Sequence, residues 1–146
     1  MVNYMKLEIA ARGENEGFAR SAVAAFALFL NPSLSELSDI KTAVSEAVTN
    51  CVVHAYGDGM GKILIECSAE RLETGGALHI RVTDYGCGIE DVEKAVSPFF
   101  TTLPEEERSG MGFTVMETFM DDVEVESIID VGTKVTMVKQ IGKNRL

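Results

Sequence analysis

The apolar positions along the chain change their spacing several times, and each change predicts a new element. Alternating apolar and polar residues predict strands at 4–10, 62–69, 77–84, 123–129 and 133–140, the first of them at a sheet edge. Apolar residues three and four apart predict helices at 15–30, 33–56 and 113–120, with a short helix at 90–96. We therefore expect one domain spanning 1–146 with an α+β fold, a two-layer sandwich in which helices cover one face of a mixed, mainly antiparallel sheet.

The helix expected at 33–56 carries the clearest start signal and an unusual set of polar residues. Ser33 and Glu36 after a proline form a capping-box pattern, which satisfies backbone donors of the first turn. The apolar positions fall on one broad arc: Ile40, Ala43, Val44, Ala47, Val48, Cys51 and Val52. Glu46, Asn50 and His54 lie four residues apart and form a ridge at the border of that arc. The ridge is either a polar boundary or the lining of a cleft, and we assign His54 a structural role.

The helix expected at 15–30 carries one isolated basic residue. Asn31 and Pro32 end this helix, and its spacing places four apolar residues near one face: Phe18, Ala22, Phe26 and Phe29. Arg20 is the only basic residue between Arg12 and Lys41. It is either a solvated arginine or a contact for an acidic group on a partner.

Composition and charge exclude several classes of protein. The 146 residues are 46% hydrophobic and 25% charged, which excludes a mainly disordered chain. The net charge of −10 argues against a nucleic-acid-binding or membrane-binding surface and would attract a basic protein partner. The longest apolar run, 22–30, is too short to cross a bilayer. Cys51, Cys67 and Cys87 form no C-x-x-C pair, so we expect neither disulfides nor a zinc site. We therefore also expect a cytoplasmic location.

Three glycine-containing segments carry further candidate chemistry. Asp84 has the parity of the apolar residues of its strand, so its carboxylate either points toward the core or forms a turn with the segment that follows, Tyr85-Gly86-Cys87-Gly88. The polar stretch 98–112 has the length of a lid or binding loop and ends in Ser109-Gly110-Met111-Gly112. Thr133 follows Gly132 and shares the inward parity of the last strand.

Two common nucleotide-binding motifs are excluded. Gly61 and Lys62 do not belong to a P-loop, because position 56 is tyrosine and position 63 is isoleucine. The segment 86–91 follows a strand, as a dinucleotide fingerprint does, but it ends in Asp91 and no long helix follows.

The candidate residues stand in a fixed order that matches a known family. The order is Glu46 and Asn50, then Asp84-x-Gly86-x-Gly88, then Ser109-Gly110-Met111-Gly112, then Gly132-Thr133. This set resembles the N box, G1 box, G2 box and final G-T of the GHKL superfamily, whose ATP site has the Bergerat fold. The segments E-A-V-T-N-x-V-V-H-A-Y and P-F-F-T-T-x-P-E-x-E-R-S-G-M-G-F look like those of the anti-sigma-factor serine kinases of Gram-positive bacteria. The resemblance runs from the first strand to about residue 139.

The resemblance implies a site for the base of ATP. Asp84 would accept the exocyclic amine of adenine, whereas guanine would present an oxygen to this carboxylate. Thr133 would complete the contact to the base, directly or through water. Gly86 and Gly88 would let the backbone pass close to the nucleotide.

The resemblance also implies a site for Mg²⁺ and the phosphates. Backbone N–H groups at the start of a helix would bind the phosphates, in the segment Ser109, Gly110, Met111 and Gly112. Asn50 would supply an oxygen ligand to Mg²⁺, and Glu46 would take a proton from an attacking hydroxyl. Arg108 is the only basic residue of the stretch 98–112, and it would meet the γ-phosphate.

The function implied by the resemblance is that of a homodimeric serine protein kinase that is also a binding inhibitor. It would hold a sporulation sigma factor of the sigma F type and phosphorylate an anti-anti-sigma protein on serine. Two alternatives stay open. One is a detached histidine-kinase catalytic domain, although this chain has only His54 and His79, both inside the expected domain. The other is an ATPase switch in which water accepts the phosphoryl group.

Overall fold

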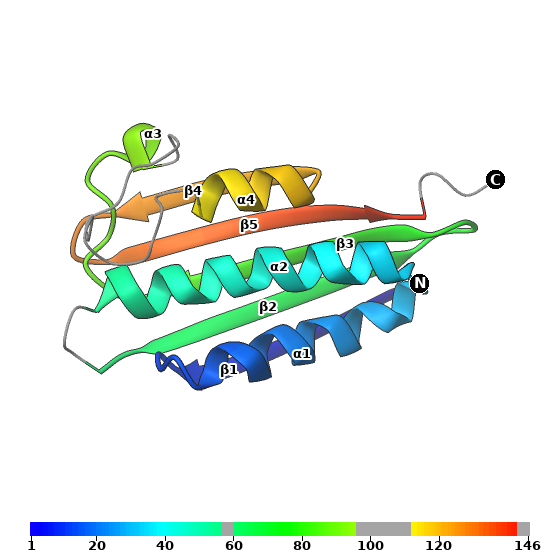
Figure 1. The fold of residues 1–146 in the computed structure, drawn as a ribbon, viewed down its shortest axis with the longest axis horizontal. Helices are drawn as coiled ribbons and strands as arrows, with labels where there is room; N and C mark the ends of the chain where they lie inside the picture. Colours follow the sequence, from blue (N-terminus) through cyan, green and yellow to red (C-terminus); the bar gives the residue numbers. More distant parts are fainter. Residues whose placement is uncertain (57–59, 96–111, 143–146) are drawn as a thin grey trace.

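The structure is a computed structural model that describes residues 1–56, 60–95 and 112–142. One sheet contains all the described strands, β1 (Val2–Ala10), β2 (Lys62–Arg71), β3 (Gly76–Asp84), β4 (Asp122–Ile128) and β5 (Gly132–Ile141), in the order β1-β2-β3-β5-β4 (Figure 1). β1 is an edge strand, as expected. Although β3 and β4 run in the same direction, β5 lies between them, so the sheet expected to be mixed has only antiparallel pairings among its described strands.

The helices cover one face of the sheet, which confirms the two-layer α+β fold. α1 (Asn15–Ala27), α2 (Leu34–Asn50) and α4 (Gly112–Phe119) lie side by side on this face (Figure 1). The 3-10 helix η1 (Leu28–Leu30) extends α1, and the short α3 (Val92–Ala95) follows β3. No described helix combines the length and the apolar character needed to cross a membrane.

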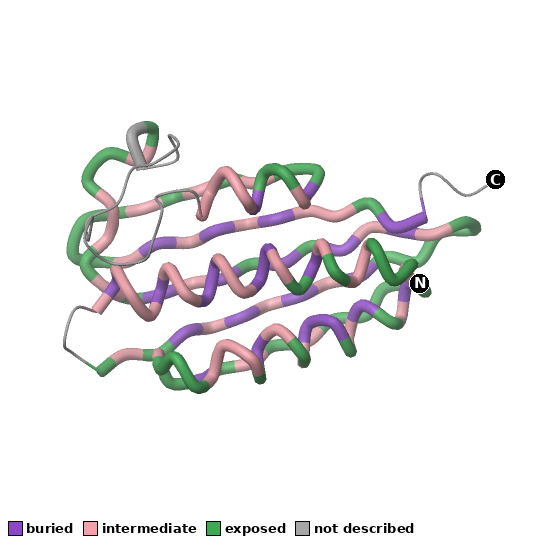
Figure 2. The backbone as a smooth tube through the Cα atoms, viewed as in Figure 1, coloured by how far each residue is buried: buried purple, intermediate pink, exposed green. Residues whose placement is uncertain are grey.

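The core lies between the helices and the inner face of the sheet. Buried positions alternate with intermediate or exposed ones along β2, β3 and β5 (Figure 2). The fully buried sheet residues with the largest side chains are Ile63, Ile65, Leu78, Ile80, Val82, Met137 and Ile141. The buried arc of α2 contains Ile40, Ala43, Val44, Ala47 and Val48, as its spacing predicted. Burial of this apolar surface is the main contribution to the stability of the fold. It also fixes which end of α2 packs beside which end of β3.

The start of α2 is fixed by its own sequence. Ser33 Oγ accepts a hydrogen bond from the Glu36 backbone N–H at 3.0 Å, and Glu36 Oε1 accepts one from the Ser33 N–H at 2.8 Å. Both halves of the predicted capping box are therefore present. The helix continues beyond Asn50 as a π-helical turn, η2 (Cys51–Ala55), so the extent predicted for this helix is confirmed but its last turn is wider than an α-helix.

The face predicted for α1 is correct only in part, because Phe26 and Phe29 pack against the core but Phe18 does not. Phe18 is 57% exposed, and the residues that the helix buries are Ala19, Val23, Ala24 and Ala27. Alanine side chains let α1 approach α2 closely, and phenylalanine at these positions would hold the two helices apart. Phe29 lies at the border instead, where the Arg71 guanidinium stacks 4.0 Å from its ring centroid and donates to its carbonyl oxygen.

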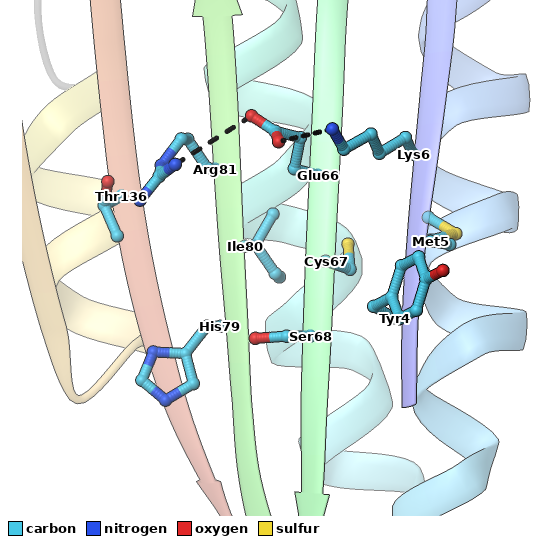
Figure 3. A pocket seen from close by; sticks show the side chains of 10 residues that line it. All are labelled: Tyr4, Met5, Lys6, Glu66, Cys67, Ser68, His79, Ile80, Arg81 and Thr136. Carbon is cyan, nitrogen blue, oxygen red and sulfur yellow. Dashed lines mark ion pairs between the residues drawn. The ribbon is translucent and has the colours of Figure 1, made fainter. Parts of the chain in front are cut away.

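The outer face of the sheet is polar. Glu66 lies 3.7 Å from Lys6 Nζ on β1 and 4.0 Å from Arg81 Nη1 on β3, within a shallow hollow of about 380 Å³ (Figure 3). These exposed ion pairs contribute little to stability. The hollow lies on the face opposite α2, so it is separate from the ridge of Glu46 and Asn50.

Candidate active site

The polar ridge of α2 meets the beginning of α4. A Cβ atom built at Gly112 would lie 3.1 Å from Asn50 Nδ2 and 3.4 Å from Glu46 Oε2. Glycine therefore lets the first turn of α4 lie directly against these two side chains. The N–H groups of that turn and the helix dipole favour an anion at this place. The predicted neighbourhood of Glu46, Asn50 and Gly112 is thus present in the structure.

The other end of the site is the carboxylate of Asp84, which is only 5% exposed. Its Oδ1 atom accepts hydrogen bonds from the backbone N–H groups of Gly86 at 3.0 Å and Thr133 at 3.2 Å, and the thiol of Cys51 donates to the same carboxylate. Burial raises the pKa of Asp84 above its ordinary value, and the three donors oppose that shift. The carboxylate therefore points inward, as its parity predicted, and it also forms the turn with the following segment through the Gly86 N–H, so the two alternatives hold together.

Asp84 still has capacity to accept a ligand. An ionised carboxylate offers about four acceptor positions, and three donors use three of them. A ligand that brings one N–H donor would complete the set without adding an unpaired polar group. The exocyclic amine of adenine is such a donor.

Cys51 connects the ridge of Glu46 and Asn50 with the carboxylate of Asp84. It follows Asn50 directly in the chain, and its thiol contacts Asp84. Burial raises the pKa of the Cys51 thiol well above its ordinary value, and the nearby Asp84 carboxylate raises it further. The thiol therefore stays protonated and acts as a hydrogen-bond donor to Asp84.

The end of the π-helical turn η2 is hydrogen-bonded to the loop that follows β3. The Ala55 carbonyl accepts from the Cys87 N–H at 2.8 Å, and a Cβ atom built at Gly86 would lie 2.2 Å from the same carbonyl oxygen. Tyr56 Oη donates to the Lys62 carbonyl at 2.5 Å and accepts from the Tyr85 N–H at 2.7 Å. The loop after Asp84 is therefore held by the Ala55 carbonyl and the Tyr56 hydroxyl, at the end of the same helix that carries Glu46 and Asn50.

We predict that Gly86→Ala destabilises the fold and weakens nucleotide binding together. Its Cβ would overlap the Ala55 carbonyl, which is backbone and cannot move aside as a side chain does. Overpacking of this kind costs about 1–3 kcal/mol. Gly13→Ala is the matched control, because a Cβ there meets nothing within 4 Å. Urea unfolding of both variants tests this, and equal stability of Gly86→Ala and the wild type would contradict it.

A hydroxyl network fixes Thr133. Ser127 on β4 lies opposite Thr133 in the sheet, and their hydroxyl oxygens are 2.8 Å apart. The Ile89 N–H donates to Ser127 Oγ at 2.7 Å, and Ser127 Oγ lies 3.2 Å from the Gly132 carbonyl oxygen. Thr133 is buried beside Asp84, as its parity predicted.

Several site predictions lie outside the described residues: Arg108, Ser109, Gly110 and Met111. Gly88 is placed near the site, with a left-handed φ of 79° and a Cβ position 2.5 Å from the Ile128 carbonyl oxygen, so only glycine fits there without strain. Arg20 lies on α1, away from Asp84. Its Nη1 is 3.2 Å from Glu16 Oε1 and 3.4 Å from Ser45 Oγ, and its side chain is 43% exposed.

Three residues of the site were missed from the sequence. Ser127 has the inward parity of Val123 and Val125, so a polar residue at a core-facing position was a usable signal. Cys51 was assigned only to the apolar arc of α2. Tyr56 gave no signal, because its role depends on where the next strand begins.

The residues present fit Mg²⁺ and ATP. Asp84 offers a buried acceptor for the base, and the start of α4 offers backbone N–H groups for phosphate. The described residues contain no cluster of three or more His, Cys, Asp or Glu side chains that could hold a metal. A hard cation here would take the amide oxygen of Asn50 and oxygens from the phosphates and water.

This arrangement defines a class of protein. The family model described as "Histidine kinase-like ATPase domain" matches residues 9–139. Solved structures agree on the fold: the RsbU and RsbW domains of Rv1364c from Mycobacterium tuberculosis align over 95% of this chain and 32% of that one, with a TM-score of 0.64 and 17% identity. A mycobacterial sensor histidine kinase, MprB, aligns over 94% of this chain and 98% of that one, with a TM-score of 0.54 and 15% identity.

Relatives at higher identity narrow the class. The anti-sigma F factor of Caldanaerobacter subterraneus subsp. tengcongensis is 55% identical over 143 residues, which are 98% of this chain and 97% of that protein. The anti-sigma F factor of Clostridium perfringens strain 13 is 54% identical over 142 residues, 97% of this chain and 99% of that protein. The chain therefore belongs to the histidine kinase-like ATPase family and, within it, to the group of anti-sigma F factors.

Proposed function

We propose that this protein is an ATP-dependent serine kinase that also inhibits a sigma factor. The observation that carries the proposal is the placement of Glu46 and Asn50 against the first turn of α4, next to the buried acceptor Asp84. The identity of 55% to an anti-sigma F factor supports the inhibitory role. Sigma F would be held away from RNA polymerase during sporulation, in the cytoplasm.

Different residues of the chain would bind the base and the phosphates of ATP. Asp84 and Thr133 select the base, and the backbone N–H groups of α4 bind phosphate. Asn50 would hold Mg²⁺ through its amide oxygen. Bound ATP supplies the phosphoryl group. Glu46, one helical turn from Asn50, accepts the proton of the attacking serine hydroxyl of an anti-anti-sigma protein. Arg108 would stabilise charge on the transferred group.

Arg20 is proposed as a contact for an acidic group on a partner. Glu16, one turn earlier on α1, and Ser45 on α2 hold its guanidinium at the surface, and Ser45 also contacts Glu16. A guanidinium held in this way loses less conformational entropy on binding than a mobile one.

We predict that the protein is a homodimer formed through β1. Among the described strands, this edge strand pairs with β2 alone, and it carries exposed apolar side chains at its start, including Tyr4, which is 76% exposed. Tyr4→Arg should shift the protein toward monomer in sedimentation at micromolar concentration. Ile128→Arg, an exposed apolar residue on the opposite edge strand, should not. A wild-type monomer with and without ATP would rule out the dimer.

Transfer of labelled phosphate tests the proposed reaction. The full chain is incubated with Mg²⁺, γ-labelled ATP and an anti-anti-sigma protein, and the product is treated with acid and with alkali. We expect label on the partner that survives acid and is released by alkali, as for phosphoserine. Acid-labile label on the chain itself would support a histidine kinase, and label found only as free phosphate would support an ATPase switch. Either result would overturn the proposal.

A further inference from the structure

Lys139 on β5 joins three elements at the end of α4 that lies farthest from Gly112. Its Nζ atom donates to the carbonyl of Phe119, the last residue of α4, at 2.7 Å and lies 3.0 Å from Asp39 Oδ2 on α2. Only 12% of the Lys139 side chain is exposed, so water and salt screen this ion pair less than a surface pair. One ammonium therefore binds both α2 and the C-terminal end of α4 to the sheet.

The two oxygens that Lys139 contacts would repel each other without it. The carbonyl at the end of a helix has no partner within the helix and carries partial negative charge from the helix dipole. The carboxylate of Asp39 is negative as well. An ammonium has three donors, so it can serve both oxygens at once. The position of this end of α4 beside α2 therefore depends on the charge of Lys139.

The contact with Asp39 lies on the same side of α2 as the ridge of Glu46 and Asn50. Asp39 precedes Glu46 by seven residues, which is close to two helical turns and about 10 Å along the axis. α4 has eight residues and is about 12 Å long. It thus contacts one side of α2 at both its ends, through Lys139 at its last residue and through Gly112 at its first turn (Figure 1). A shift at one end of so short a helix displaces the other end.

We propose that Lys139 is a positioning residue for phosphate binding, which holds the last residue of α4 beside Asp39 and so aligns the first turn of the helix with the ridge of α2. This inference rests on the proposed ATP site. Lys139 lies at the opposite end of α4 from the phosphates and acts through the helix. Hydrogen bonds from backbone N–H groups weaken steeply when they are misaligned, so a rotation of α4 would weaken phosphate binding. The base contacts of Asp84 and Thr133 come from β3 and β5 and do not involve α4.

Binding of two ligands distinguishes the positioning of α4 from general stability. Mg-ATP would use both the base contacts and α4, whereas adenosine would use the base contacts alone. We expect Lys139→Met to bind Mg-ATP roughly five- to tenfold more weakly, the worth of one hydrogen bond, and to bind adenosine as wild type does. Lys139→Arg should restore the ratio of the two affinities, since a guanidinium keeps the charge and can donate to both oxygens. Calorimetry measures Mg-ATP binding, and a nuclear magnetic resonance titration measures the weaker binding of adenosine.

Two control variants separate this effect from a loss of stability or of an exposed ion pair. Ile141→Val removes one buried carbon from the same strand, so it should lower the melting temperature and keep the ratio of affinities. Lys6→Met removes an exposed ion pair on the outer face and should behave as wild type. If Lys139→Met does not fold, Asp39→Ala replaces it, because it breaks the same ion pair at a more exposed side chain, and it should change the ratio in the same direction.

The outcomes that contradict the inference differ from those that contradict the proposed function. An unchanged ratio in the folded variant, or an equal weakening of Mg-ATP and adenosine, would overturn the role of Lys139 alone. Wild type that does not bind Mg-ATP would overturn the proposed function as well.

Discussion

Glu46→Ala should bind Mg-ATP normally and transfer phosphate to serine roughly 10² to 10⁴ times more slowly, the usual worth of a general base. The carboxylate lies against the first turn of α4, where the phosphates are expected, and it is the proposed proton acceptor. The loose transition state of phosphoryl transfer asks little of a base, so we expect an effect near the lower limit. Single-turnover transfer and calorimetric binding on the same protein measure the two quantities separately.

Two further variants sharpen this prediction. Asn50→Ala should lose binding and transfer together, because a lost metal ligand weakens both the ground state and the transition state. Glu124→Gln, on the exposed outer side of β4, should leave both unchanged. A normal transfer rate in Glu46→Ala would mean that the ridge is only a polar boundary and that the proposed mechanism is wrong.

Asp84→Asn should weaken ATP binding by roughly 10- to 100-fold, the worth of a hydrogen bond to a charged group, and should reduce discrimination against GTP. The amide keeps one oxygen for the N–H groups of Gly86 and Thr133, but it replaces the other acceptor with a donor. Calorimetry with both nucleotides measures this. Asp122→Asn on the exposed side of β4 is the control. Unchanged affinity and selectivity in Asp84→Asn would remove this residue from the site.

The same substitution should not cost stability at neutral pH. Burial raises the pKa of Asp84 above its ordinary value of 3.8, so the ionised form is disfavoured in the folded state. The stabilising contribution of a raised pKa is complete below the ordinary value and is lost as the pH rises through the folded pKa. At pH 7 the charged group is therefore a net cost, and Asp84→Asn should melt at the same temperature as wild type or higher.

Local rules in the sequence predicted the parts of the fold that depend on neighbouring residues. The capping box at Ser33 and Glu36 and the inward parity of Asp84 and Thr133 follow from short-range geometry, and the structure confirms them. The exposure of Phe18 on α1 was not predicted, because helix packing selected small alanines over this larger side chain. Packing between elements cannot be seen in the spacing of one helix.

The connections within the site were also beyond the sequence. The π-helical turn at 51–55 and the contact of Cys51 with Asp84 depend on how the end of α2 meets the loop after β3. The order of motifs placed Glu46, Asn50 and Asp84 in one site, but only the fold provides the thiol and the carbonyl that join its two ends.

The most direct test is a crystal structure of the full chain with Mg²⁺ and a non-hydrolysable ATP analogue. The account predicts that the adenine amine donates to the Asp84 carboxylate, that the Thr133 hydroxyl lies within direct or one-water reach of N1, and that the Asn50 amide oxygen binds Mg²⁺ with the γ-phosphate beside Glu46. A nucleotide bound with Asp84 out of contact with the base, or with the metal away from Asn50, would contradict it.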